Sequence, residues 1–148
     1  METVSLPNTQ HKTLSGNHAI FKTVGAVIAA LLTWFLVATA VNLALRALWP
    51  HYHEAETTFN FTIAMKLARL VLGAISTLGA GFVAAWIGKS RMGSATLTGI
   101  ALLCLFIPGH YRIWDKFPVW YHLTFLMSLL PLTLLGAALN HRAGRKAP

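Results

Sequence analysis

The residues of this sequence with the chemistry to bind a metal are four histidines in two short polar stretches. The stretches are "HYHE" at 51–54 and "PGHYRIWDKFPVWYH" at 108–122, and the histidines are His51, His53, His110 and His122. Imidazole and carboxylate groups together are typical ligands of transition metals, and two histidines at similar depth on adjacent helices can hold a haem. A His-x-His pair suits a loop, and the later two histidines are separated by a turn region. We therefore expect no cofactor and keep a transition-metal or haem site as the alternative.

Basic residues form a second candidate site, for an anion or a lipid headgroup. Asn42 and Arg46 share one face of one apolar segment, and Lys66 and Arg69 share one face of the next. If the two faces meet, they form a basic mouth that the acidic residues of the connecting stretch neutralise. The sequence favours ion pairs and snorkelling side chains at the membrane interface. A binding site built from Arg46, Lys66 and Arg69 is left open.

The sequence contains no recognisable arrangement of nucleophile, base and acid. Its single cysteine, Cys104, lies inside an apolar segment, where burial leaves a thiol inert. The acidic residues near the apolar segments are Glu54, Glu56 and Asp115, and their spacing forms no catalytic carboxylate pair. The sequence therefore favours a protein without enzymatic activity.

The composition is that of a membrane protein. The 148 residues are 55% hydrophobic and 11% charged, with a mean hydropathy of +0.58, whereas soluble domains carry about 25% charged residues. A helix needs about 20 apolar residues to cross a bilayer. The sequence predicts an all-α integral membrane protein, an antiparallel bundle of transmembrane helices at about 22–48, 63–88, 92–108 and 118–140. We expect Pro108 to end the third helix and Pro131 to kink the fourth.

One alternative concerns the first apolar segment, which contains a signal-peptide cleavage pattern at 38–40. The apolar run is longer than the apolar core of a usual signal peptide, and it continues past that position to Leu48 and Trp49. We expect the segment to be retained as a membrane span.

The flanking segments predict the domain organisation and the orientation. Residues 1–19 are polar and predict a disordered tail, residues 20–141 form the membrane domain, and 142–148 form a basic tail. With both termini cytoplasmic, most basic loop residues lie inside, as the positive-inside rule requires: Lys12, Lys22, Lys89, Arg91, Arg142, Arg145 and Lys146. The net charge of +8 then reflects contact with anionic lipid, and no nucleic-acid binding is expected. Four spans joined by short loops are typical of small proteins of the bacterial inner membrane. We therefore expect the protein to lie in a plasma membrane of this kind.

Small residues at four-residue spacing predict how the helices pack. The second apolar segment carries Gly73, Thr77, Gly81 and Ala85, a stripe along which another backbone can approach closely. The first segment carries Gly25, Ala29 and Thr33 in the same register. We expect these two helices to pack together, or one stripe to form a seam between two copies of the chain.

These observations favour an accessory, structural or transport-associated membrane subunit that acts through helix packing. Its expected partners are the lipid bilayer and either a second copy of the chain or another membrane protein. A transporter is a weaker interpretation, because no span has an acidic residue at its middle that could couple transport to protons. The alternative class is a metal- or haem-binding membrane protein that uses the outer histidines.

Overall fold

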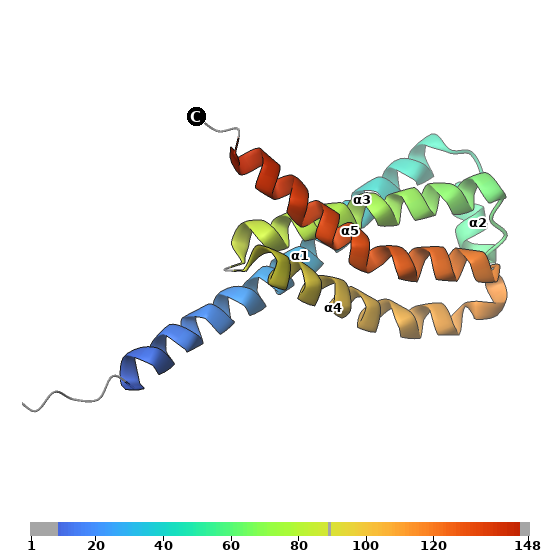
Figure 1. Cartoon of the computed structure of the whole chain (residues 1–148). Helices are drawn as coiled ribbons and strands as arrows, with labels where there is room; N and C mark the ends of the chain where they lie inside the picture. Colours follow the sequence, from blue (N-terminus) through green and yellow to red (C-terminus); the bar gives the residue numbers. More distant parts are fainter. Residues whose placement is uncertain (1–8, 89, 146–148) are drawn as a thin grey trace, which may run out of the picture.

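The long elements of the protein are four helices. The computed structural model describes residues 9–88 and 90–145, which form helices and no strand (Figure 1). The long helices are α1 (Thr9–Leu48), α3 (Ile63–Ile87), α4 (Arg91–Arg112) and α5 (Val119–Arg145). Short helices lie in two connections, α2 (Tyr52–Thr58) and the 3₁₀ turn η1 (Trp114–Lys116). The predicted all-helical class is confirmed.

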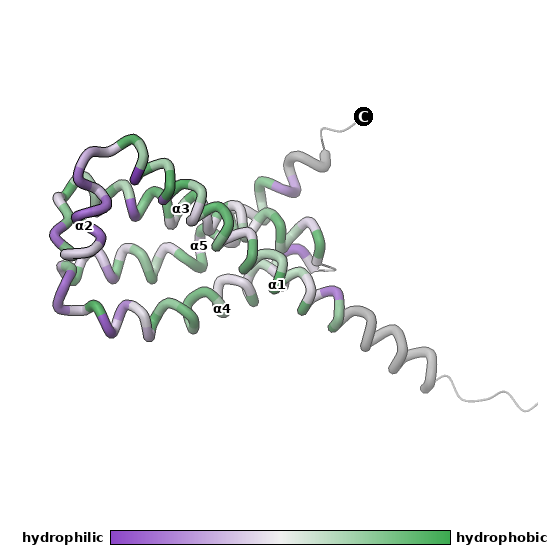
Figure 2. The backbone as a smooth tube through the Cα atoms, turned by 180° about the vertical axis from the view of Figure 1, so that it is seen from behind, coloured by the Kyte–Doolittle hydropathy of each residue, from purple (hydrophilic) through white to green (hydrophobic). Residues whose placement is uncertain are grey.

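Each long helix contains a segment that is long and apolar enough to cross a membrane. These segments are Ile20–Leu48, Ile63–Ile87, Arg91–Arg112 and Val119–His141. Figure 2 shows hydrophobic residues along the long helices and hydrophilic residues gathered at the end of the bundle that α2 covers. The four predicted membrane spans therefore have their counterparts in the structure.

Helix α1 begins earlier than predicted and α5 ends later. Helix α1 starts at Thr9, so residues 9–19 of the predicted disordered tail are helical, while residues 1–8 lie outside the described part of the chain. Extending an existing helix adds a hydrogen bond per residue without a new nucleation cost, and no proline interrupts residues 9–48. By the same argument α5 continues past residue 140 to Arg145, and residues 146–148 lie outside the described part.

The prediction that Pro108 ends the third helix is wrong, because α4 continues through it to Arg112. A proline removes one backbone hydrogen bond, here the one to the carbonyl of Cys104, but its φ angle suits a helix. The turn after Pro108 carries His110, which is buried against the Phe125 ring of α5 at 4.7 Å between centroids. This packing offsets the lost bond. Pro131 lies inside α5, which changes direction along its length in Figure 1.

Local signals explain where the helices begin. Thr62 accepts a hydrogen bond from the backbone N–H of Met65, and Ser90 accepts one from Gly93, so α3 and α4 both start with a side-chain cap. Helix α2 is bounded by two residues with left-handed φ angles, His51 at 63° and Phe59 at 58°. These two turns place α2 across the end of the bundle, a helix where a short loop was expected.

The stripe of small residues on α3 lies mainly against α5. A Cβ atom on Gly81 would overlap the backbone carbonyl of Thr133, and one on Gly73 would lie 2.7 Å from the Phe125 ring. Only Thr77 of this stripe bonds to α1, through the indole N–H of Trp34, which donates to its hydroxyl at 3.0 Å. The small-residue stripes of α1 and α3 were expected to face each other. The α3 stripe instead packs closely on α5, because its glycines let the α5 backbone approach.

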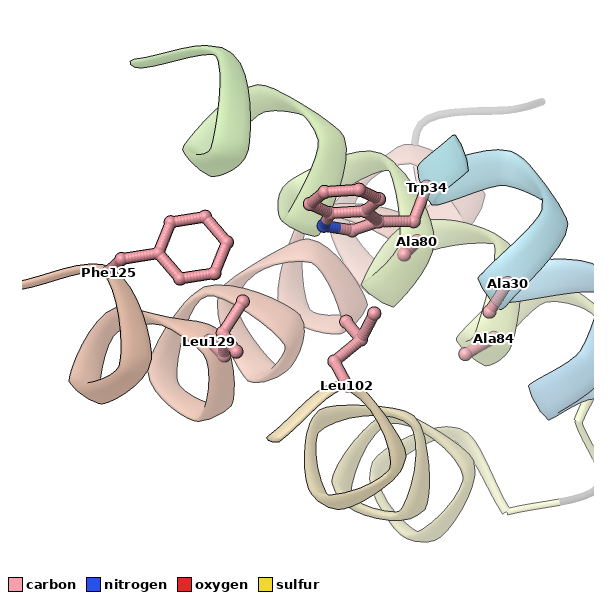
Figure 3. Packing of buried hydrophobic residues seen from close by; sticks show 7 residues of the cluster. All are labelled: Ala30, Trp34, Ala80, Ala84, Leu102, Phe125 and Leu129. Atoms are coloured by element: carbon pink, nitrogen blue, oxygen red, sulfur yellow. The ribbon is translucent and has the colours of Figure 1, made fainter. Parts of the chain in front are cut away.

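Helices α1 and α3 nevertheless pack together, through other residues. The apolar cluster in Figure 3 brings side chains from α1, α3, α4 and α5 into contact: Ala30, Trp34, Ala80, Ala84, Leu102, Phe125 and Leu129. In the predicted α1 stripe, a Cβ on Gly25 would meet no described atom within 4 Å, while Thr33 bonds back to the carbonyl of Ala29. Trp34 bonds to Thr77 of α3 and packs on the Phe106 ring of α4, so it anchors α1 to these two helices.

Candidate functional site

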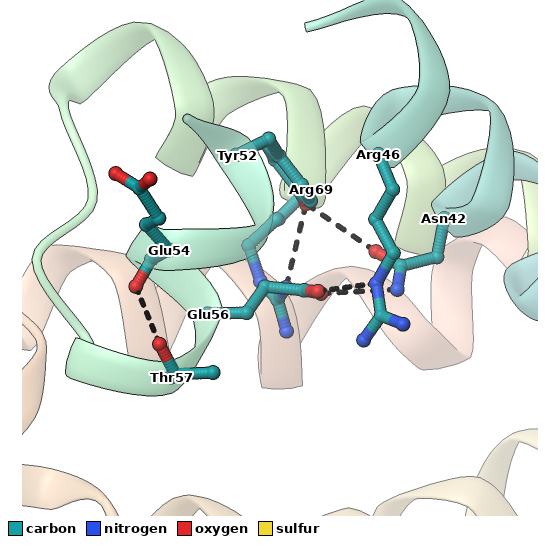
Figure 4. A network of polar contacts seen from close by, with 7 residues as sticks. All are labelled: Asn42, Arg46, Tyr52, Glu54, Glu56, Thr57 and Arg69. Atoms are coloured by element: carbon teal, nitrogen blue, oxygen red, sulfur yellow. Dashed lines mark hydrogen bonds and ion pairs between the residues drawn. The ribbon is translucent and has the colours of Figure 1, made fainter. Parts of the chain in front are cut away.

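A network of polar side chains joins α1, α2 and α3 at the end of the bundle (Figure 4). The Glu56 carboxylate of α2 is its centre. Arg46 Nε lies 2.5 Å from one carboxylate oxygen, and Arg69 Nη1 lies 3.2 Å from the other. The Asn42 amide donates to Glu56 at 3.0 Å, and the Tyr52 hydroxyl donates to the amide oxygen of Asn42 at 3.4 Å. The network thus fixes α2 to both neighbouring helices.

The charges of this network do not cancel. Partial burial raises the pKa of Glu56, but the hydrogen bonds from Asn42 and Arg46 and the charges of Arg46 and Arg69 outweigh it, so the pKa lies below the usual 4.5. Glu56 is therefore a carboxylate at neutral pH. Two guanidinium groups face this one carboxylate, which leaves one net positive charge.

Two of the three predicted basic residues meet in this network. Arg46 and Arg69 both bond to Glu56, whereas Lys66 makes no side-chain contact with the network among the described residues. The Arg69 guanidinium lies over the Phe61 ring, 4.8 Å from its centroid, and beside Tyr121. Its Nε is buried and has no hydrogen-bond partner in the described chain. The side chains of Arg46 and Arg69 are 42% and 32% exposed, so both remain accessible to a ligand.

The four predicted histidines do not form one group. His110 of α4 and His122 of α5 contact each other directly, with 2.8 Å between their Nδ1 atoms. His51 is exposed and lies 3.1 Å from Glu54, and His53 is exposed. Within the described ranges, no three His, Cys, Asp or Glu residues are close enough to hold a metal ion. A metal site at these histidines stays a prediction, and a haem between His110 and His122 would require their rings to separate.

A cavity of about 620 Å³ connects the polar network to His110. Its wall comes from all four long helices and from α2. Along α1 it reaches from Trp34 to Arg46, roughly 18 Å at the helical rise. One end is aromatic and is lined by Trp34, Phe106 and Phe125, and the other is polar and is lined by Arg46, Glu56 and Arg69. His110 also lines the cavity, and its ring lies against Phe125 at 4.7 Å.

The chain shows no match to any family model, to any curated protein or to any solved structure in comparisons with each. An amphipathic wall of this kind binds molecules that have an apolar body and a polar head, and its volume lies within the range of roughly 300–1,000 Å³ typical of small-molecule sites.

Sequence reasoning identified part of the polar end and missed the aromatic end. The spacing of Asn42 and Arg46 indicated a polar face on α1, and Arg69 was placed opposite it. Trp34, Phe106 and Phe125 look like ordinary apolar residues of three separate spans, so no pattern within one segment signals that they share a cavity.

Proposed function

We propose that the protein is a non-enzymatic membrane protein that binds a monoanionic amphipathic lipid in the cavity, and that it serves as an accessory or transport-associated subunit. One observation carries this proposal: an aromatic cavity ends at two arginines that share a single carboxylate. The apolar end suits part of an acyl chain, and the polar end suits a head group with one negative charge.

Electrostatics favours an anionic occupant. An unbalanced cation at the edge of a membrane-spanning segment costs free energy, and such residues pair with an opposite charge wherever one is available. Arg46 and Arg69 already use Glu56, and one further negative charge would balance the cluster. Arginine also binds phosphate and carboxylate oxygens through several N–H donors at once, which favours a phosphate or carboxylate head group.

The proposed orientation places both termini in the cytoplasm and the cavity's polar end at the outer leaflet of a bacterial inner membrane. The distribution of Lys and Arg supports it, because the loop and the tails on the side of the termini hold most of these residues. Helices joined by short connections then alternate in direction across the bilayer, as an antiparallel bundle. Reporter fusions at both ends of the chain test this orientation, and an outward report from either end contradicts it.

Native mass spectrometry of the detergent-solubilised protein with added lipids tests the binding proposal. We expect phosphatidylglycerol to bind more tightly than zwitterionic phosphatidylcholine, and the double substitution Arg46→Gln, Arg69→Gln to weaken phosphatidylglycerol binding about tenfold. Lys66→Gln is the control. It removes one positive charge from α3, as Arg69→Gln does, but Lys66 is not among the described residues that line the cavity. Equal loss in the control and the double variant would refute the cavity as the site.

A further inference from the structure

The hydrogen bonds of His122 determine which of its ring nitrogens carries the proton. Its Nε2 lies 3.3 Å from the backbone carbonyl oxygen of Trp114, and a carbonyl only accepts, so Nε2 is the donor. The residue is 0% exposed, and its ring stacks on Trp114 at 4.6 Å. In the neutral ring the other nitrogen, Nδ1, is therefore an acceptor.

The tautomer of His122 determines the tautomer of His110, because the two rings share one hydrogen bond. The Nδ1 atom of His122 accepts, so the Nδ1–H of His110 donates across the 2.8 Å contact. The Nε2 atom of His110 then has a free lone pair. No described residue forms a hydrogen bond to this Nε2, and it is not one of the fully enclosed atoms.

His110 is one of the residues that line the cavity. Its ring lies against two rings of α5, Phe125 at 4.7 Å and Tyr121 at 6.2 Å, and Tyr121 in turn lies beside Arg69. The guanidinium groups of Arg46 and Arg69 can only donate hydrogen bonds. The lining of the cavity therefore includes cationic donors, from Arg46 and Arg69, and an acceptor, from His110.

We infer that the cavity recognises a head group that carries both one negative charge and a hydroxyl donor, and that His110 accepts a hydrogen bond from this hydroxyl. Phosphatidylglycerol represents this class of lipid, with its phosphodiester toward Arg46 and Arg69 and its glycerol hydroxyls toward Nε2. His122 is a positioning residue, because it sets the tautomer of His110 and does not line the cavity within the described chain. This inference rests on the proposed lipid-binding function.

The test compares two lipids of equal charge. Phosphatidylmethanol has the phosphodiester of phosphatidylglycerol but no hydroxyl in its head group. Native mass spectrometry is expected to show that the wild-type protein binds phosphatidylglycerol about fivefold more tightly than phosphatidylmethanol, the effect of one hydrogen bond. His110→Phe keeps the ring stacking but removes the acceptor, so it should bring the ratio of the two affinities to about one. His53→Phe, at an exposed histidine, is the control.

The outcomes separate this inference from the function on which it rests. Equal binding of the two lipids by the wild-type protein would overturn hydroxyl recognition, while stronger binding of both than of phosphatidylcholine would keep the proposed function. If neither lipid bound better than phosphatidylcholine, both proposals would fail. The double substitution His110→Phe, His122→Phe replaces the whole buried pair, so it tests the same loss of preference if the single variant does not fold. A preference retained in a folded variant overturns the role of His110.

Discussion

The rings of His110 and His122 join the ends of α4 and α5 through a single hydrogen bond of 2.8 Å between their Nδ1 atoms. A second bond joins His122 to the carbonyl of Trp114, at the start of η1 between these helices. The turn between α4 and α5 is thus held from within by a buried imidazole. This imidazole also orients the ring of His110, a residue that lines the cavity.

Loss of the His122 ring should destabilise the fold. His122→Ala removes a fully buried side chain, its stacking on Trp114, and the hydrogen-bond partner of His110. We expect the free energy of unfolding to fall by about 2–4 kcal/mol, measured by denaturation of the detergent-solubilised protein. His53→Ala, at an exposed position, should change it by less than about 0.5 kcal/mol. Similar losses for both variants would contradict the structural role of the pair.

Glu56 should make stability depend on pH below its usual pKa. Its pKa in the folded protein is lowered because the hydrogen bonds from Asn42 and Arg46, together with the two arginine charges, outweigh the effect of burial. The contribution of Glu56 is therefore fully present above pH 4.5, its unperturbed pKa, and is lost as the pH falls through the lower value of the folded state. Thermal unfolding of the wild-type protein across this range should show the loss.

Glu56→Gln should remove that part of the pH dependence and cost about 1–3 kcal/mol at neutral pH, because two arginines lose their charged acceptor. Glu54→Gln is the matched control, since Glu54 lies two residues away on α2 and its side chain is 75% exposed. A Glu56→Gln variant with the wild-type pH profile would show that the network does not stabilise the folded state.

Close packing of α3 on α5 should make Gly81 intolerant of any side chain. Gly81→Ala places a Cβ on the backbone of Thr133, where no rotamer change can relieve the overlap, so we expect a loss of about 1–3 kcal/mol. Gly25→Ala is the control, because its Cβ meets no described atom within 4 Å and alanine favours a helix. If the double variant Gly73→Leu, Gly81→Leu left the solubilised assembly unchanged, the packing role of the stripe would be wrong.

The spans could be predicted from the sequence because the membrane imposes a length and an apolar composition on each helix. Boundaries were less predictable, since Pro108 breaks one hydrogen bond but a buried His110 beyond it keeps the helix intact. Helix α2 escaped prediction because its position depends on two left-handed residues, His51 and Phe59, neither of which is a glycine.

Only part of the candidate site could be predicted from the sequence, and the reason is physical. A polar residue at membrane depth stands out against apolar neighbours, so Arg46, Arg69 and the histidines were recognised one segment at a time. The partner of each such residue lies on another helix, and single-segment spacing carries no information on it. The contact between His110 and His122 follows from tertiary packing alone. Neutralisation by an acidic residue of the connecting stretch was expected, and Glu56 provides it for Arg46 and Arg69.

An optical spectrum and elemental analysis of the untagged protein distinguish lipid binding from the haem or transition-metal alternative. Both nitrogens of His122 are engaged, one with His110 and one with Trp114, so ligation of a metal by His122 would require one of these hydrogen bonds to break. We therefore expect no Soret band and no stoichiometric metal. A Soret band that His110→Ala, His122→Ala abolishes would assign the cavity to haem instead, with Arg46 and Arg69 as partners of its propionates, and would overturn the lipid proposal.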